Sequence, residues 1–279
     1  MLSEKYDAFE HLWRSIFPFD GKEKLVAMLT GYADESGNDG NSPLLAVAGY
    51  VSDVELWAKF QVQWKQFLTE EEIPLFHSSD MLALSGDFTE EKGWNAERVT
   101  RVMQRADLIT KEHVLFGLVS YTDIPECEKW FPLVEDDGST RKRFSAEYLF
   151  AGTQLAWGIS RWARENRYSD PINYVFECGA PGKGYLMDAL DAGRKTDPMI
   201  GGVAFSCKTR VHQLHPADKL AQQCRRALVR HLSGQETSVI MERLIATKLG
   251  KAYRMDSENL PLLRKIADVN KQLERVVLR

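Results

Sequence analysis

Hydrophobic and polar positions in the first half of the chain follow two periods, one typical of strands and one of helices. Residues 25–30 and 44–51 are short apolar runs, which predict buried strands. The polar, glycine-containing segment 37–43 between them predicts the turn of an antiparallel hairpin. Further on, apolar residues at helical spacing predict helices over 54–68 and 96–111.

The second half alternates strands with helices. Its predicted elements are strands at 114–121, 172–176 and 203–207, a helix over 144–165, and a helix from Pro216 to about His231. Proline at the first turn of a helix is favourable, because its fixed backbone angle suits that position. This order of elements predicts an α/β fold with a mixed five-stranded sheet flanked by helices.

The chain shows no internal repeat, low-complexity tract or proline-rich linker, so we expect one α/β domain over residues 1–234. An amphipathic N-terminal helix precedes its first strand. Residues 235–279 are charged, and their pattern predicts a helical C-terminal extension without a core of its own. That extension offers a surface for a protein partner or a second copy of the chain.

Composition excludes several classes of protein. The 279 residues are 44% hydrophobic and 27% charged, as in a folded globular protein. No run approaches the roughly 18 apolar residues of a membrane span, and the acidic N-terminus lacks the plan of a signal peptide. We therefore expect a cytoplasmic protein with no membrane contact. The net charge of −4 argues against non-specific coating of nucleic acid, although a local basic groove remains compatible with it.

The cysteines carry no metal or disulfide motif that can be read from their spacing. All four are far apart in the sequence: Cys127, Cys178, Cys207 and Cys224. Zinc ribbons and small disulfide frameworks need closer pairs. We expect buried free thiols.

Acidic residues stand at the ends of two predicted strands. Asp34 and Glu35 directly follow the first apolar run, and Glu177 follows the strand at 172–176. Asp218 lies in the first turn of the final helix, where a crossover returns the chain to the same edge of the sheet. For Asp34 and Glu35 alone, a solvated hairpin turn is the alternative interpretation.

Carboxylates that converge repel one another unless a cation neutralises them. A hard divalent ion such as Mg²⁺ or Mn²⁺ takes oxygen ligands and keeps open positions for water and phosphate. Two such ions, roughly 3.5 to 4 Å apart, can activate a water and stabilise the leaving oxygen in phosphodiester hydrolysis. The acids therefore predict a metal site of hydrolytic type.

Three segments carry a resemblance to a known family: Asp34-Glu35-Ser36-Gly37, Gly49-Tyr50-Val51 and Leu214–Ala221 (LHPADKLA). Together they resemble the DESG-motif family of bacterial and phage proteins, a domain of unknown function in the ribonuclease H-like superfamily. The resemblance covers about residues 25–231 and implies a ribonuclease H-like fold with nuclease or transposase-like activity.

The same resemblance implies roles for individual acids. Asp34, Glu177 and Asp218 would be catalytic metal ligands, and Glu35 an accessory acid. Neighbours in a strand point to opposite faces, so we expect Asp34 and Glu35 to reach one ion together only if the strand twists at its end. The chain departs from the family pattern at His215 and Pro216, where relatives carry an amide and an apolar residue.

Four further residues are candidate substrate contacts: Ser36, His77, Lys183 and His215. The imidazole of His77 suits a proton carrier or phosphate contact; a loop histidine bonded to a backbone carbonyl is the alternative. Lys183 lies in a glycine-rich segment, 179–184, that lacks the Ser or Thr of a P-loop and is interpreted as a flexible loop. Basic runs at 141–143 and 225–226 are candidate contacts for a nucleic-acid backbone.

The sequence thus favours a Mg²⁺- or Mn²⁺-dependent nuclease that hydrolyses DNA or RNA. The alternative is a catalytically inactive ribonuclease H-like protein that binds a nucleic acid or protein partner in a mobile-element or phage-defence system. Transfer chemistry on a phosphorylated small molecule is a third class, and it would require a defined pocket.

Overall fold

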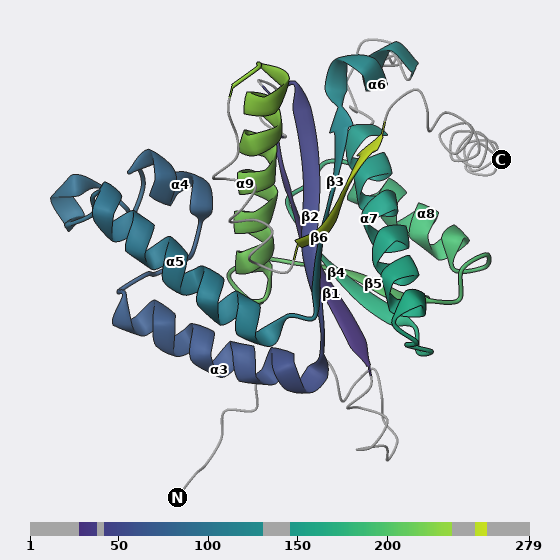
Figure 1. Cartoon of the computed structure of the whole chain (residues 1–279), viewed down its shortest axis with the longest axis horizontal. Helices are drawn as coiled ribbons and strands as arrows, with labels where there is room; N and C mark the ends of the chain where they lie inside the picture. Colours follow the sequence, from purple (N-terminus) through teal and green to yellow (C-terminus); the bar gives the residue numbers. More distant parts are fainter. Residues whose placement is uncertain (1–27, 38–41, 131–145, 236–248, 256–279) are drawn as a thin grey trace, which may run out of the picture.

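The structure is a computed structural model that describes residues 28–37, 42–130, 146–235 and 249–255. These residues form a mixed β-sheet with helices on both faces (Figure 1). Its strands are β1 (Leu29–Ser36), β2 (Leu44–Asp53), β3 (Phe116–Asp123), β4 (Ile172–Glu177), β5 (Ile200–Ser206) and β6 (Leu249–Met255). Their spatial order is β5-β4-β1-β2-β3-β6.

Strand direction decides which ends of the sheet come together. β1, β2 and β3 form an antiparallel meander, β4 runs parallel to β1, β5 parallel to β4, and β6 parallel to β3. The carboxyl ends of β1, β4 and β5 therefore lie at one edge of the sheet. Ligand sites of open α/β sheets occur at such edges.

Two helical layers enclose the sheet (Figure 1). One layer contains α3 (Val54–Glu70), α4 (Ser78–Ala83), α5 (Ala96–His113) and α9 (Leu214–Leu232). The other contains α7 (Ala146–Glu165) and α8 (Lys183–Gly193), while α6 (Ile124–Trp130) follows β3 and a short 3₁₀ turn spans Glu90–Lys92. The fold is thus three-layered, with one hydrophobic core on each side of the sheet.

Side-chain alternation along β1 assigns its residues to the two cores. Tyr32 packs in the core beneath α3 and α9, whereas Leu29 and Ala33 pack in the core beneath α7. β2 is buried along nearly its whole length, as expected of a strand near the centre of a covered sheet. Asp53 then caps α3, its Oδ1 accepting a hydrogen bond of 2.7 Å from the Leu56 N–H.

The structure confirms the α/β class and a mixed sheet flanked by helices. Two predictions are wrong in detail. The C-terminal extension, which was expected to be helical, contributes a strand, β6, that pairs with β3. The prediction missed this strand because hydrophobic periodicity carries no information on backbone pairing between distant segments. The segment expected to be a flexible loop begins a helix at Lys183, after Gly182 at φ +82°.

The predicted N-terminal helix, the basic run 141–143 and most of the extension (236–248 and 256–279) lie outside the described residues. Within the parts of the chain that the structure describes, no helix combines the length and the apolar character that a membrane crossing needs.

Candidate metal centre

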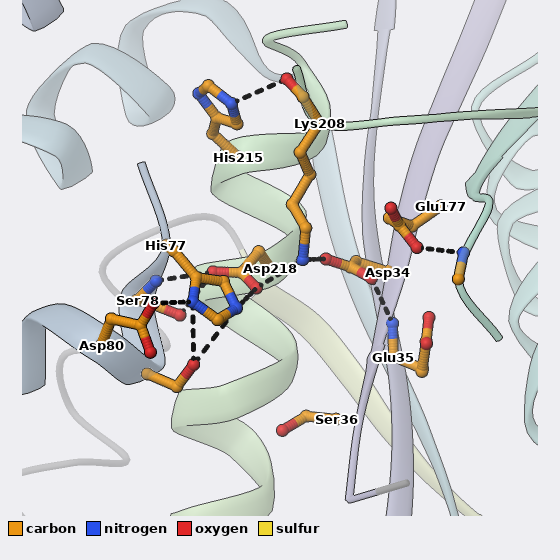
Figure 2. Close-up of polar contacts among 12 residues, drawn as sticks. Asp34, Glu35, Ser36, His77, Ser78, Asp80, Glu177, Lys208, His215 and Asp218 are labelled. Atoms are coloured by element: carbon orange, nitrogen blue, oxygen red, sulfur yellow. Dashed lines mark hydrogen bonds and ion pairs between the residues drawn. The ribbon is translucent and has the colours of Figure 1, made fainter. Parts of the chain in front are cut away.

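Three of the predicted acids meet at the carboxyl ends of β1 and β4. The parallel pairing places Ala33 opposite Phe176, so Asp34 and Glu177 are the next residues on neighbouring strands. One carboxylate oxygen from each of Asp34, Glu35 and Glu177 lies within 4.8 Å of the other two. Figure 2 shows Glu177 beside Asp34, with Glu35 below them. We call these three residues the carboxylate cluster.

Glu35 joins this cluster although it lies on the opposite side of the strand from Asp34. Alternation places Glu35 on the α7 side, with Ala33. The Asp34 carboxylate stays close to the backbone of the next residue, because its Oδ1 accepts a 2.8 Å hydrogen bond from the Glu35 N–H. At the strand end, one oxygen of each carboxylate nevertheless lies within 4.8 Å of the other.

A lysine that follows β5 joins Asp34 to Asp218. Lys208 Nζ donates hydrogen bonds to Asp34 Oδ2 at 2.8 Å and to Asp218 Oδ1 at 2.9 Å (Figure 2). Asp218 Oδ2 accepts two more, from the Ser78 N–H at 2.9 Å and the Ser78 hydroxyl at 2.6 Å. Asp218 thus belongs to the site through Lys208, and the structure does not bring it into the carboxylate cluster as the predicted third ligand.

Burial and neighbouring charge set the electrostatics of these groups. Asp34 is 2% exposed, and burial raises its pKa; Lys208 opposes this shift, while Glu35 and Asp218 add to it. Burial acts in the same direction on Asp218, but Lys208 and Ser78 outweigh it and lower the pKa. The two aspartates in turn raise the pKa of Lys208 against the effect of its burial. The ammonium group is therefore held as a fixed positive charge.

Two polar atoms near the cluster lack a hydrogen-bond partner among the described residues. They are Oε2 of Glu35 and the hydroxyl of Tyr148 on α7. Tyr148 is 1% exposed, and its pKa is raised first by burial and then by Glu35, Asp34 and Glu177. A buried polar group without a partner is energetically unfavourable, so both atoms keep an unused capacity for a hydrogen bond or a ligand bond.

The carboxylate cluster offers only oxygen donors. Carboxylate oxygens are the preferred ligands of hard divalent cations such as Mg²⁺ and Mn²⁺. Burial also raises the pKa of Glu35, with the hydrogen bond to Asp34 opposing and Glu177 adding to the shift. A divalent cation would offset the repulsion among the three acids that these shifts reflect.

His77 lies at the rim of the site, immediately before α4. Its Nδ1 is 2.8 Å from Asp80 Oδ2, and its Nε2 is 3.9 Å from Asp218 Oδ1. The side chain is 35% exposed, so it is within reach of a bound substrate. Lys183 is also exposed, at the first residue of α8, with Nζ 3.5 Å from the Cys178 carbonyl oxygen. Both predicted contacts thus lie beside the acids.

His215 and Ser36 have structural partners instead. His215 is 1% exposed; its Nδ1 accepts a 2.8 Å hydrogen bond from Trp64 Nε1, which leaves Nε2–H to donate to the Lys208 carbonyl oxygen at 3.0 Å. The predicted substrate contact at His215 therefore has no ring nitrogen to offer, and the residue positions Lys208. The Ser36 hydroxyl accepts a 3.0 Å hydrogen bond from Arg225 Nε on α9.

Sequence reasoning missed Lys208, Ser78 and Tyr148. Lys208 follows a predicted strand just as Glu177 does, so the rule that parallel strands end at one edge would have drawn attention to it. No comparable signal marks Tyr148 or Ser78, whose positions depend on how helices pack against the sheet.

Comparison with protein-family models and with curated proteins finds no match for this chain.

Proposed function

We propose that this protein is a divalent-metal-dependent nuclease that hydrolyses phosphodiester bonds, with a ribonuclease H-like fold. The observation that supports this most is the carboxylate cluster, in which Asp34, Glu35 and Glu177 lie within 4.8 Å of one another. The antiparallel β1–β2–β3 meander, with β4 and β5 added on the other side of β1, supports the fold assignment and the resemblance to the DESG-motif family.

In this proposal Asp34, Glu35 and Glu177 hold the ion, for which Mg²⁺ or Mn²⁺ fits the oxygen donors best. The bound ion would polarise the phosphodiester and lower the pKa of water at the site. Asp218 stays with Lys208 and Ser78, so the proposal differs from the ligand set that the sequence predicts.

The remaining groups supply charge and proton transfer. Lys208 keeps a positive charge next to Asp34 and favours approach of an anionic phosphate. Glu35 Oε2 has no hydrogen-bond partner among the described residues, so in this proposal it is the oxygen that takes a proton from the attacking water. At the rim, His77 Nδ1 lies 2.8 Å from Asp80 Oδ2 and its Nε2 lies 3.2 Å from the Ser79 hydroxyl. In this proposal the histidine gives a proton to the oxygen that leaves phosphorus.

Nucleic acid is the substrate class that the position of the site at an edge of the sheet favours. The acids lie at the end of a sheet with α9 beside them, and Arg226 and Arg230 are exposed on that helix. One surface hollow, lined by Gln63, Gln66, Arg105, Leu108, Ile109 and Glu112, lies between α3 and α5 and contains none of the site residues. It therefore gives no support to a small-molecule transferase.

A catalytically inactive binding protein is the second candidate. Lys208 favours it, because this ammonium group already neutralises part of the charge on Asp34 and Asp218 without a metal. Such a protein would keep the fold and bind a partner without turnover. The two candidates differ in whether the acids are needed for chemistry.

The test is cleavage of labelled single-stranded DNA, duplex DNA, RNA and RNA–DNA hybrid in Mg²⁺ or Mn²⁺. We expect one class of polymer to be cut, and Asp34→Asn and Glu177→Gln to reduce the rate by at least about 100-fold. Glu165→Gln is the matched control, since Glu165 is an exposed acid at the end of α7. Activity equal to wild type in Asp34→Asn, or no cleavage of any polymer by the folded protein, would contradict the proposal.

A further inference from the structure

Two cysteines lie side by side next to the carboxylate cluster. The parallel register places Glu177 of β4 opposite Ser206 of β5, so Cys178 and Cys207 directly follow paired residues on neighbouring strands. Both cysteines are free and half-buried, and their Sγ atoms lie within 4.8 Å of each other. This arrangement was not expected from the sequence, which suggested buried, isolated thiols.

Glu177 completes a group of three ligands with these thiols. Sγ of Cys178, Sγ of Cys207 and a carboxylate oxygen of Glu177 all lie within 4.8 Å of one another. The Cys178 thiol donates to Glu177 Oε1 at 3.7 Å, and the Gly179 N–H donates to Glu177 Oε2. The carboxylate is therefore already oriented, with one oxygen fixed by the backbone and the other directed at sulfur.

This donor set differs in kind from the carboxylate cluster. Thiolates select borderline or soft ions such as Zn²⁺ and are poor ligands for Mg²⁺. Two sulfur ligands and one carboxylate provide three of the four positions of a tetrahedral zinc site. Half-exposure leaves the fourth position accessible to water or a substrate atom.

We propose that Cys178, Cys207 and Glu177 form a second metal site, specific for a thiophilic divalent ion of the Zn²⁺ class. Binding replaces two S–H bonds by two metal–sulfur bonds, and the two protons go to solvent without any change of oxidation state. The other two cysteines, Cys127 and Cys224, are buried in separate cores and take no part.

Glu177 belongs to both ligand groups, which couples the two sites. An ion held by the thiols draws this carboxylate away from Asp34 and Glu35. If the proposed function holds, Zn²⁺ therefore inhibits Mg²⁺-dependent cleavage. Replacing Cys207 with Ser removes this inhibition and leaves cleavage in Mg²⁺ intact. This consequence rests on the proposed function, whereas the site itself does not.

The test is a titration of the reduced protein with Co²⁺ or Cd²⁺, followed by thiolate-to-metal charge-transfer absorption. We expect a band that saturates at one ion per chain and that Cys178→Ser and Cys207→Ser each abolish. Glu177→Gln should weaken binding by at least about 10-fold, since even an outer partner of a metal ligand contributes that much. Cys127→Ala and Cys224→Ala are matched controls that keep the band.

No charge-transfer band in the folded, reduced wild type would overturn the proposal, as would a band that survives in Cys178→Ser and Cys207→Ser. Cys178→Ala and Cys207→Ala provide a second pair if a serine variant does not fold, with circular dichroism reporting the fold. The measurement needs no nucleic acid, so its failure is distinct from failure of the nuclease proposal.

Discussion

At the scale of single residues, Lys208 determines whether the buried acids can be charged. Its Nζ lies 2.8 Å from Asp34 and 2.9 Å from Asp218, both of which are nearly inaccessible to solvent. A buried charge that loses its partner retains its desolvation cost without compensation. The stability of the folded protein should therefore depend strongly on this one amine.

We predict that Lys208→Met lowers the free energy of unfolding at pH 7 by about 3–5 kcal/mol, as measured by urea denaturation. Lys195→Met serves as control, since Lys195 is exposed, and should change this free energy by less than about 0.5 kcal/mol. Equal losses in the two variants would contradict the role given to Lys208.

His215 gives the protein a characteristic dependence of stability on pH. Burial, with His212 adding to it, lowers its pKa from 6.5 to about 3, so the folded protein holds the ring neutral where the unfolded chain protonates it. Between pH 6.5 and 3 the unfolded state binds the extra proton. Stability from this residue is therefore fully present above pH 6.5 and lost as the pH falls, by about 1.4 kcal/mol per pH unit.

We predict that His215→Gln is less stable than wild type at pH 7 but that the difference shrinks as the pH falls from 6.5 to 4. Denaturation at several pH values measures this. His231→Gln, at an exposed position of α9, should leave the pH profile unchanged. A difference between wild type and His215→Gln that is constant with pH would show that the histidine is not held neutral.

At the scale of elements, Gly37 holds the end of β1 close to the start of β2 and to α9. Gly37 has φ +105°, and an added Cβ would lie 2.2 Å from the Leu44 carbonyl oxygen and 2.9 Å from Arg225 Cδ. Arg225 also donates to Ser36 and Ser42, one residue on each side of the hairpin. The glycine is therefore required both by its backbone angle and by the closeness of its neighbours.

We predict that Gly37→Ala lowers the free energy of unfolding by more than Gly234→Ala. Gly234 also has positive φ (+71°), but an added Cβ there meets nothing within 4 Å. Its substitution should cost about 1–2 kcal/mol from the backbone alone, and Gly37→Ala should exceed it by at least about 1 kcal/mol. Equal costs would contradict the close contacts of Gly37 with Leu44 and Arg225.

The elements themselves show what periodicity can predict. Amphipathic helices such as α3 and α5 were predicted to within a few residues, because aromatic or aliphatic side chains recur along one face that packs on the sheet. β6 and α8 were missed because their signals are not periodic. β6 depends on backbone pairing with β3. α8 begins at Lys183, directly after Gly182, which adopts a left-handed backbone conformation.

At the scale of the whole molecule, sheet order creates the site. Asp34 and Glu177 are far apart in the sequence, and the parallel pairing of β1 with β4 makes them neighbours. Strand ends with acids could be recognised in the sequence, which is why these two residues were found. Lys208 also follows a predicted strand and could have been found by the same rule. Tyr148 could not be, since its position depends on how α7 packs around this edge.

The most direct test of the account is whether the carboxylate cluster holds a hard divalent ion. Titration of the folded protein with Mn²⁺, with free ion measured by electron paramagnetic resonance, counts bound ions without a substrate. We predict one bound Mn²⁺ per chain, greatly weakened in Asp34→Asn and Glu177→Gln and retained in Cys207→Ser. Mn²⁺ that stays free, or that binds Glu177→Gln as tightly as wild type, would contradict the account.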